Sequence, residues 1–334
     1  MTATPNLSSV QAAARLIKGK AHITPVLTST TLSTILGPEP ITNEPRHLFF
    51  KCENFQKVGA FKFRGACNAV FRLPEDAAAK GVVTHSSGNH AQALALAARM
   101  RNIPCYVVMP SNAPQVKKAA VKGYGAEIIE CEPNLEARET TSQRVLAETG
   151  GTFIHPYNHP DVISGQGTLC LELLQQAEEM GSPLDALIVP VGGGGMLSGC
   201  IVAGKGLRPD LRIFAAEPEG ADDCARSFAA KEWIPQTSPN TIADGLLTST
   251  GEIAWPLIRD NCEDILTVSE QQIIDAMRLV FERMKLVIEP SSAVGVAAAL
   301  YSEGFTKLEG IKNVGVVLCG GNVNLDQLPW NAAQ

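Results

Sequence analysis

Residues 54–66 read NFQKVGAFKFRGA, directly after a short apolar strand predicted at 48–52. Lys62 stands between Phe61 and Phe63, where the apolar run turns into a helical pattern. Most lysines are solvated surface charges, because burying an unpaired ammonium is costly. Between two phenyl rings, however, Lys62 would have a lowered pKa and a nucleophilic neutral amine, as a Schiff-base lysine requires. The sequence therefore leaves two interpretations of Lys62, a solvated surface charge or a nucleophilic neutral amine.

The composition is that of a globular protein. The chain has 334 residues, of which 45% are hydrophobic and 19% charged, so a large core can form and two domains fit the length. The net charge is −6, and Lys and Arg never form a run longer than two. We therefore expect no nucleic-acid partner, since surfaces that bind polyanions are basic.

The chain carries no signal for export or for a membrane. Its first residues, MTATPN, contain neither a basic nor an apolar leader region, and no stretch approaches the roughly 18 apolar residues of a membrane span. Nine cysteines are scattered without a Cys-x-x-Cys pair, which fits neither a disulfide framework nor a zinc site. We expect reduced thiols, no membrane association and a cytoplasmic location.

Strand and helix patterns alternate along the chain. Three strand–helix units are predicted, at 82–84 with 91–100, 105–109 with 115–122, and 127–130 with 135–149. Such alternation predicts an α/β fold with parallel sheets covered by helices. Residues 75–160 form one compact open unit in this prediction, although no shift in composition marks a domain boundary. Further buried strands follow at 186–191 and 314–318.

Small polar residues follow the first of these strands, in the sequence Ser86-Ser87-Gly88-Asn89-His90. Hydroxyls, an amide and free N–H groups at a helix N-terminus suit a carboxylate. The same residues also fit a capped helix whose side chains satisfy only its own amides. Because ligands gather at the carboxyl ends of strands in open α/β sheets, we favour the carboxylate site.

Four consecutive glycines, Gly192, Gly193, Gly194 and Gly195, follow the strand at 186–191 and precede Met196 and a helix. Such a loop presents backbone N–H groups to a phosphate. It lacks the Gly-Lys-Ser/Thr of a Walker loop and the spacing of a dinucleotide fingerprint, so a phosphate monoester is the better ligand. The alternative is a tight turn that only glycine permits.

A third strand end carries the sequence Cys319-Gly320-Gly321-Asn322. Cys319 is either a core thiol or a neutral hydrogen-bond partner of a ligand ring. An amine at Lys62, a phosphate site at 192–195 and a carboxylate site at 86–90 together describe pyridoxal phosphate holding an amino acid. The combination is far more specific than any one of its parts.

The chain resembles the fold-type II pyridoxal-phosphate enzymes, which share the fold of tryptophan synthase β. Within them it resembles the serine racemases and serine/threonine ammonia-lyases, including the threo-3-hydroxyaspartate ammonia-lyases. Matching segments cover nearly the whole chain, at 24–27, 61–66, 86–90, 165–168, 192–196, 215–218, 242–245 and 320–322. The resemblance implies two open, parallel-rich α/β domains with the cofactor in the cleft between them. The large domain would comprise residues 1–74 and 161–334, with residues 75–160 as a small inserted domain.

The resemblance also implies how the cofactor is held. Lys62 binds it covalently, Phe61 packs on the pyridine ring, and Asn89 reaches the ring hydroxyl. The loop from Gly192 to Met196 cradles the phosphate. Cys319 faces the pyridine nitrogen, where relatives carry Ser, Thr or Cys, and such a neutral partner leaves that nitrogen unprotonated.

For the substrate, the resemblance implies that Lys62 takes the α-proton on one face, while Ser87 matches the opposite-face acid/base of the racemases. The substrate carboxylate would lie at Ser86, Ser87, Asn89 and His90. Arg138 aligns with an arginine that can face the distal end of the substrate and pair there with the β-carboxylate of a 3-hydroxyaspartate; the alternative is an ordinary surface arginine. Tyr157 stands where animal-type serine racemase has asparagine and resembles the ammonia-lyases.

Glu217, the carbonyl of Ala221 and Asp223 match a divalent-cation site of this family, and oxygen ligands of this kind suit Mg²⁺ or Ca²⁺. A solvated acidic loop is the alternative. Near the family's nucleotide-effector site Lys57 is retained but Val58 replaces a threonine, so control by ATP is left open. A homodimer is implied by analogy with the family.

We therefore expect a pyridoxal-phosphate-dependent ammonia-lyase (dehydratase). It would convert serine, threonine or threo-3-hydroxyaspartate to a 2-oxo acid and ammonia, with serine racemisation alongside. A serine racemase proper, with elimination as a side activity, is the alternative within the family. A β-replacement synthase of the cysteine-synthase type shares the fold, as would a non-catalytic amino-acid-binding module, although the presence of both Lys62 and Ser87 argues against a mere binding module.

Overall fold

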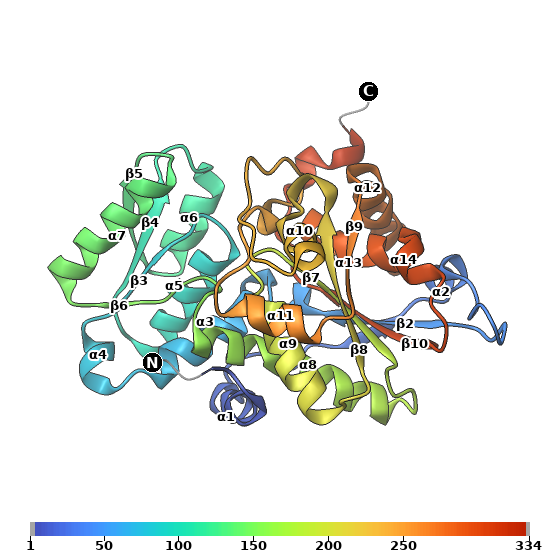
Figure 1. Cartoon of the computed structure of the whole chain (residues 1–334). Coiled ribbons are helices and arrows are strands. Elements are labelled where there is room, and N and C mark those ends of the chain that lie inside the picture. The colour runs from blue at the N-terminus through green and yellow to red at the C-terminus, as the bar shows by residue number, and fades with distance from the viewer. Residues whose placement is uncertain (1–3, 332–334) are drawn as a thin grey trace.

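Two separate β-sheets organise the chain (Figure 1). The computed structural model describes residues 4–331, apart from the side chains of residues 116 and 135. The larger sheet has the strand order β1-β2-β10-β7-β8-β9, and β1 is the strand that runs antiparallel to its neighbour. Its strands are β1 (Val26–Thr28), β2 (His47–Cys52), β7 (Ala186–Pro190), β8 (Arg212–Pro218), β9 (Asp264–Val268) and β10 (Asn313–Leu318).

Helices cover both faces of the larger sheet, because its central strands are apolar on both faces. In β7, Leu187 and Val189 belong to the core formed with α8 and α9, whereas Ala186 and Ile188 belong to the core formed with α12 and α13. The helices of this part are α1 (Leu7–Ile17), α2 (Thr30–Leu36), α8 (Pro160–Glu179), α9 (Gly195–Leu207), α10 (Asp223–Ala230), α11 (Ala254–Asn261), α12 (Glu270–Leu279), α13 (Pro290–Tyr301) and α14 (Glu303–Thr306).

The smaller sheet is parallel throughout, with the order β5-β4-β3-β6, and lies on the left of Figure 1. One face shares a core with α3 and α5, and the other packs Val83 and Val108 against Val145 of α7. Its elements are β3 (Val82–His85), β4 (Cys105–Pro110), β5 (Glu127–Cys131), β6 (Thr152–Phe153), α3 (Lys62–Arg72), α4 (Glu75–Ala79), α5 (Asn89–Arg101), α6 (Gln115–Gly123) and α7 (Leu135–Thr149).

The predicted α/β fold with parallel-rich sheets is confirmed, and the three predicted strand–helix units occur as β3–α5, β4–α6 and β5–α7. The four strands of the smaller sheet all fall within residues 75–160. The boundary at residue 74 stays a prediction. Phe63 and Val70 of α3, which precede it, are buried together with Leu94 of α5, which follows it.

Helix α3 is fixed against α8 by a close backbone crossing and by buried ion pairs. A Cβ on Gly165 would lie 2.6 Å from the Cα of Gly65, so the helices meet at glycines. Arg64, which is fully buried, donates from Nε to Glu53 (2.7 Å) and from Nη1 to Glu172 (2.7 Å). Breaking a buried pair leaves an uncompensated charge, so the first turn of α3 is held in one place.

Two further features of the structure concern the cysteines and the lengths of the helices. All nine cysteines are free and buried, in keeping with the expected reduced thiols. Within residues 4–331, no helix is both long enough and apolar enough to cross a membrane.

Candidate active site

The loop that precedes α3 pairs with the end of β10. The N–H of Phe61 donates to the carbonyl of Cys319 (3.0 Å), and Ala60 forms an antiparallel bridge with Gly320. The N–H of Gly321 donates in turn to the carbonyl of Gly59 (2.9 Å). Two stretches from opposite ends of the sequence, the lysine stretch and the strand end at 319–322, are thereby brought side by side.

Lys62 is the first residue of α3, and its amine lies between two aromatic rings. Its Nζ is 5.1 Å from the ring centre of Phe61 and 6.0 Å from that of Tyr157, and it donates to the carbonyl of Pro156 (2.9 Å). Burial lowers the pKa of Lys62 to about 8. The lowered pKa agrees with the sequence argument, but the second ring is Tyr157. Phe63 points into the core instead, because adjacent helical residues face different directions.

The lowered pKa of Lys62 makes a prediction about the uptake of an aldehyde cofactor, which requires the neutral amine. Since the amine is neutral above a pKa of about 8, the rate of covalent uptake by cofactor-free protein should rise roughly tenfold per pH unit below pH 8 and level off above it. The measurement is the absorbance change after mixing with pyridoxal phosphate between pH 6.5 and 9.5. The reaction of a free alkylamine at each pH corrects for ionisation of the aldehyde. A rate that still rises tenfold per unit beyond pH 9 would show an ordinary exposed lysine.

The glycine loop is buried and its amides are unpaired. Gly192, Gly193 and Gly194 lie between β7 and α9, and within residues 4–331 their N–H groups donate no hydrogen bond. Gly194 has φ +79°, which disfavours a side chain. A Cβ on Gly193 would lie 2.2 Å from Cγ of Tyr157. Because buried amides normally have partners, the loop fits an anion better than a turn that serves only the fold.

Cys319 directly follows β10, beside the lysine loop, and is buried. Its Sγ lies 3.3 Å from Oγ of Ser292, a hydroxyl that also donates to the carbonyl of Gly320 (2.6 Å). Burial raises the pKa of the Cys319 thiol, and the nearby charge of Glu289 raises it further. The thiol is therefore neutral, in agreement with the neutral partner that the family resemblance implies at this position.

The polar residues after β3 differ in how deeply they are buried. Ser86 continues the strand by donating its N–H to the carbonyl of Val108 (3.2 Å), and Ser86 and Ser87 both remain partly exposed at the carboxyl end of the sheet. His90 is buried, and its Nε2 lies 3.2 Å from the carbonyl of Ile154. Burial holds the pKa of His90 well below its usual value. The His90 ring therefore contacts the segment that follows β6, and its place in a carboxylate site stays a prediction.

Asn89, in the first turn of α5, contacts a residue that the sequence patterns did not single out. Its Nδ2 donates to both carboxylate oxygens of Glu289, at 3.0 and 3.1 Å. Burial raises the pKa of Glu289 to about 7, and the hydrogen bond from Asn89 opposes that rise. In the sequence, Glu289 precedes Pro290 and looks like an ordinary acidic residue at a helix start. No local pattern reveals a partner 200 positions away.

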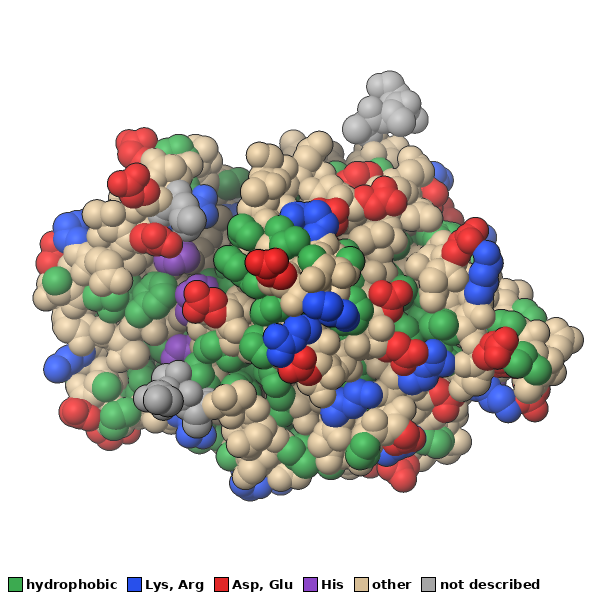
Figure 2. Space-filling view, in the orientation of Figure 1, with side chains coloured by type: hydrophobic (Ala, Val, Ile, Leu, Met, Phe, Trp, Pro, Cys, Tyr) green, Lys and Arg blue, Asp and Glu red, His purple; other side chains and the backbone are tan. Residues whose placement is uncertain are grey.

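A row of aromatic side chains runs from Tyr157 to the end of β3. The rings of His155 and Tyr157 are 4.6 Å apart between centres, and those of His85 and His155 are 6.0 Å apart. Burial lowers the pKa of His155 to about 4, so this ring is neutral at physiological pH. Figure 2 shows histidine side chains, in purple, on the face of the molecule near the smaller sheet.

Arg138, on α7, lies next to this aromatic row. Its charge helps to lower the pKa of His85, for which burial is the larger cause. The Nε of Arg138 is buried without a hydrogen-bond partner, and the side chain forms no ion pair within residues 4–331. His85 directly precedes Ser86 and Ser87, so an unpaired guanidinium lies near the edge of the sheet that carries both serines.

Glu217 and Asp223 are both completely buried. Glu217 accepts N–H groups from Cys224 (3.1 Å) and Ala225 (2.9 Å), and Asp223 accepts both the N–H and the hydroxyl of Thr250. Burial raises the pKa of each carboxyl group, most strongly that of Glu217, where Asp223 adds to the effect.

Ala221, the third residue of the predicted cation site, lies in the short turn between these two acids. Within residues 4–331, no group of three or more His, Cys, Asp or Glu side chains is arranged for a metal. In the described part of the chain neither carboxylate forms an ion pair, since the nearby Arg226 pairs with Asp222, and two such buried carboxylates fit a cation chemically. The donors would be those two carboxylates and backbone oxygen.

Comparison with known proteins identifies the family of this chain. The model of the family described as pyridoxal-phosphate dependent enzyme matches residues 17–320. The chain belongs to this family. The residues fit the cofactor, since unpaired buried amides in the loop 192–194 suit its phosphate and the Lys62 amine suits its aldehyde.

Similar proteins include both racemases and dehydratases. Serine racemase of Dictyostelium discoideum is 48% identical over 328 residues, which cover 98% of this chain and 97% of that protein. Beta-hydroxyaspartate dehydratase of Paracoccus denitrificans is 49% identical over 328 residues, with coverage of 98% and 99%. The solved structure of a pyridoxal 5'-phosphate-dependent aspartate racemase superposes with a TM-score of 0.90 at 42% identity, covering 98% of each chain.

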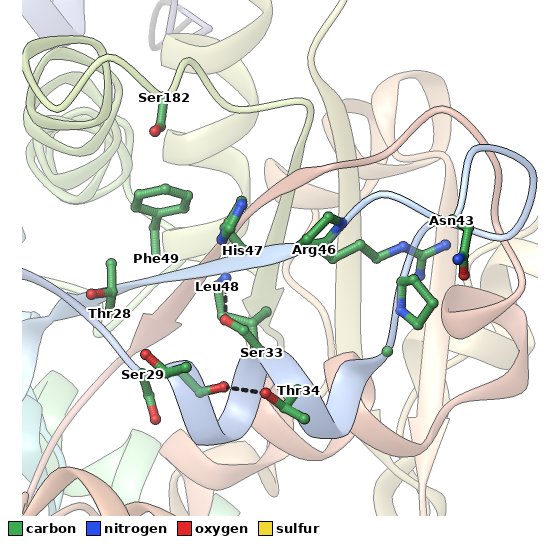
Figure 3. Close-up of a pocket in the computed structure, with 14 residues that line it drawn as sticks. Thr28, Ser29, Ser33, Thr34, Asn43, Arg46, His47, Leu48, Phe49 and Ser182 are labelled. Carbon is green, nitrogen blue, oxygen red and sulfur yellow. Dashed lines mark hydrogen bonds between the residues drawn. The ribbon is translucent and has the colours of Figure 1, made fainter.

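A pocket of this pyridoxal-phosphate-dependent enzyme lies elsewhere, between α2 and β2 (Figure 3). It has a volume of about 500 Å³, and none of the predicted site residues lines it. Arg46 in its wall is buried and donates to the carbonyls of Thr306 (2.9 Å) and Leu308 (2.5 Å). These bonds satisfy carbonyls at the end of α14, so Arg46 has a structural function here.

Proposed function

We propose that this enzyme is an ammonia-lyase (dehydratase) that converts a β-hydroxy amino acid to a 2-oxo acid and ammonia, and racemises serine alongside. Its substrate is serine, threonine or threo-3-hydroxyaspartate. The observation that carries the proposal is the amine of Lys62, whose pKa is lowered to about 8 between the rings of Phe61 and Tyr157. An amine with this pKa can accept the α-proton of a substrate, because a fraction of it is unprotonated near neutral pH.

The protein's own groups supply proton transfer and orientation. When bound, the cofactor provides the electron-withdrawing ring that makes the α-proton of an attached amino acid acidic. Lys62 takes that proton from one face, and the β-hydroxyl leaves as hydroxide. The resulting enamine hydrolyses to the 2-oxo acid and ammonia. With burial raising the pKa of its thiol, Cys319 would be a neutral partner for the ring nitrogen and would leave the bound ring less electron-withdrawing, which would favour elimination or prompt reprotonation over side reactions.

Arg138 supports threo-3-hydroxyaspartate as a substrate. Its Nε is buried without a partner near the serines that follow β3, so a second carboxylate would satisfy it. The similarity to a beta-hydroxyaspartate dehydratase and to an aspartate racemase, whose named substrates carry such a carboxylate, agrees with this assignment. Serine and threonine lack that group and would be bound at the predicted carboxylate site of Ser86, Ser87, Asn89 and His90.

The test is a 2-oxo acid assay of the holoenzyme with L-serine, D-serine, L-threonine and both threo-3-hydroxyaspartates. Arg138→Gln should raise KM for threo-3-hydroxyaspartate by about tenfold to a hundredfold, the value of a charge-assisted pair, and leave KM for serine within twofold. Arg144→Gln is the control, since Arg144 lies on the same helix but pairs with Glu148 at the surface. An equal loss for both substrates would contradict a role in recognition of the β-carboxylate.

The second candidate function is serine racemase, with elimination as a side activity. It is supported by the partial exposure of Ser87 after β3, where this hydroxyl would act as the base on the face opposite Lys62, and by the similarity to serine racemase. D-Serine and pyruvate formed from L-serine are measured together, and the larger initial rate ranks the two activities. Turnover of O-acetylserine with sulfide, without any 2-oxo acid, would instead support a β-replacement synthase.

A divalent cation, Mg²⁺ or Ca²⁺, belongs to the same proposal. Two buried carboxylates, Glu217 and Asp223, would bind it together with the carbonyl of Ala221. Thr250, which donates to Asp223, also approaches Gly194, so the cation would act on the glycine loop through this contact. Activity and melting temperature are compared with chelator and with each cation added back.

Assembly and location complete the proposal. We assign a homodimer by family analogy, and the mass of the holoenzyme in solution tests it. The nine free thiols fit a reducing, cytoplasmic environment.

A further inference from the structure

The side chain of Glu289 is buried, and its carboxylate does not cap the helix that it precedes, α13. It is 3% exposed and stands at the N-terminus of α13, where an acidic side chain ordinarily caps the helix. Glu289 makes no such cap, and within residues 4–331 no Lys, Arg or His forms an ion pair with it. Burying a carboxylate that has no ion pair costs free energy, so the hydrogen bonds of Glu289 indicate a role other than helix capping.

The carboxylate of Glu289 accepts hydrogen bonds from two asparagines. Nδ2 of Asn89 lies 3.0 and 3.1 Å from its two oxygens, and the backbone N–H of Asn322 lies 3.2 Å from Oε2. On the other side, Oδ1 of Asn89 accepts from Nδ2 of Asn322 (2.8 Å). Because Nδ2 of Asn322 donates to Oδ1 of Asn89, the amide of Asn89 turns its carbonyl to Asn322 and its NH₂ group to the two oxygens of Glu289.

The surrounding backbone enforces this arrangement. A Cβ on Gly320 would lie 2.8 Å from the carboxyl group of Glu289, so that position has room only for glycine. Nδ2 of Asn322 also donates to the carbonyl of Val58 (2.8 Å), and Val58 has φ +58°. A β-branched residue in this region is strained and persists only where its surroundings hold it. The asparagine pair and the lysine loop are therefore held as one unit.

We propose that Glu289 is a positioning residue that orients the amide of Asn89 so that it presents an N–H, and not its carbonyl, to the ring hydroxyl of pyridoxal phosphate. The inference rests on the role proposed for Asn89 in cofactor binding. One of the two amide hydrogens of Asn89 is taken by Glu289, and the other remains for the ring oxygen. Without the carboxylate, either end of the amide can face the cofactor.

The test measures cofactor affinity and the absorption spectrum of the bound cofactor. The ratio of its visible to its near-ultraviolet band reports where the proton lies between the ring oxygen and the lysine nitrogen, and a merely structural role would not move it. Glu289→Gln should weaken binding of pyridoxal phosphate to cofactor-free protein by about tenfold, the loss of one charge-assisted hydrogen bond, and change the band ratio. Asn89→Ala should do the same. In the double variant, Glu289→Gln should add less than twofold to the effect of Asn89→Ala.

Glu39→Gln is the matched control, because Glu39 is equally buried and accepts backbone N–H groups of Ile41, Thr42 and Gly310 far from the lysine. It should leave the band ratio unchanged even where it lowers the melting temperature. If Glu289→Gln does not fold, Glu289→Asp takes its place, since it keeps the charge but withdraws it from Asn89 by one methylene, and the same direction of change is expected.

The outcomes separate this inference from the function on which it rests. A wild-type protein that binds no pyridoxal phosphate would overturn the proposed function itself. A response to Asn89→Ala but none to Glu289→Gln or Glu289→Asp would overturn only the positioning role. Full additivity of the two changes in the double variant would also overturn it, because Glu289 would then act independently of Asn89.

Discussion

Replacement of Lys62 by alanine is expected to lower the rate of 2-oxo acid formation by roughly four orders of magnitude and to abolish the visible absorption band of the bound cofactor. The variant loses covalent attachment and proton transfer together, because one amine performs both. Its fold should survive, since the side chain makes one hydrogen bond, to the carbonyl of Pro156. Non-covalent binding of pyridoxal phosphate through the glycine loop should persist at reduced affinity.

Lys57→Ala is the matched control for Lys62→Ala. Lys57 lies five positions earlier in the chain, but its Nζ lies over the ring of Phe63, 5.5 Å from the ring centre. Lys57→Ala should leave both the absorption band and the rate of elimination within a few-fold of the wild type. A Lys62→Ala protein that keeps the band and more than a few per cent of the activity would mean that another lysine holds the cofactor.

Gly193→Ala is expected to abolish useful cofactor binding, with an affinity loss of about a hundredfold or more, the scale of severe overpacking in a close-packed site. The added Cβ would lie 2.2 Å from the ring of Tyr157, so either the ring or the loop must move. Movement of the loop misplaces the three unpaired amides that suit the phosphate. The free energy of unfolding should fall by about 1–3 kcal/mol. Affinity is measured by titration of the cofactor-free protein.

The double variant Gly193→Ala with Tyr157→Ala separates the two causes. Removal of the ring should recover most of the lost stability, because the clash is with the ring atoms. Gly123→Ala, in α6, is the control, since nothing lies within 4 Å of its added Cβ. If Gly193→Ala binds the cofactor within threefold of the wild type, the loop is a tight turn and not a phosphate site.

Much of the fold could be predicted because its signals are local. The alternation of apolar strands with helices between residues 82 and 149 predicted the parallel smaller sheet, and the glycine run predicted a strand-to-helix junction at residue 192. The lowered pKa of Lys62 was also expected from an adjacent aromatic residue, Phe61. In each case, the physical cause lies within one or two turns of chain.

The parts that could not be predicted depend on contacts between distant residues. Glu289 meets Asn89 across 200 positions, and nothing near Glu289 in the sequence distinguishes it from a helix-start acid. The contact of the His90 ring with the carbonyl of Ile154 could not be predicted either, because it joins α5 to the segment after β6. Ion pairs such as Arg64 with Glu172 also depend on how α3 and α8 cross.

The most direct test of this account is to locate the residue that binds the cofactor. The holoenzyme is reduced with borohydride to fix the covalent link, digested, and the modified peptide is sequenced by mass spectrometry. The account predicts one pyridoxyl group per chain, on Lys62. Modification of Lys51, Lys57 or any other lysine, or the absence of a fixed adduct in protein that shows the visible band, would contradict it.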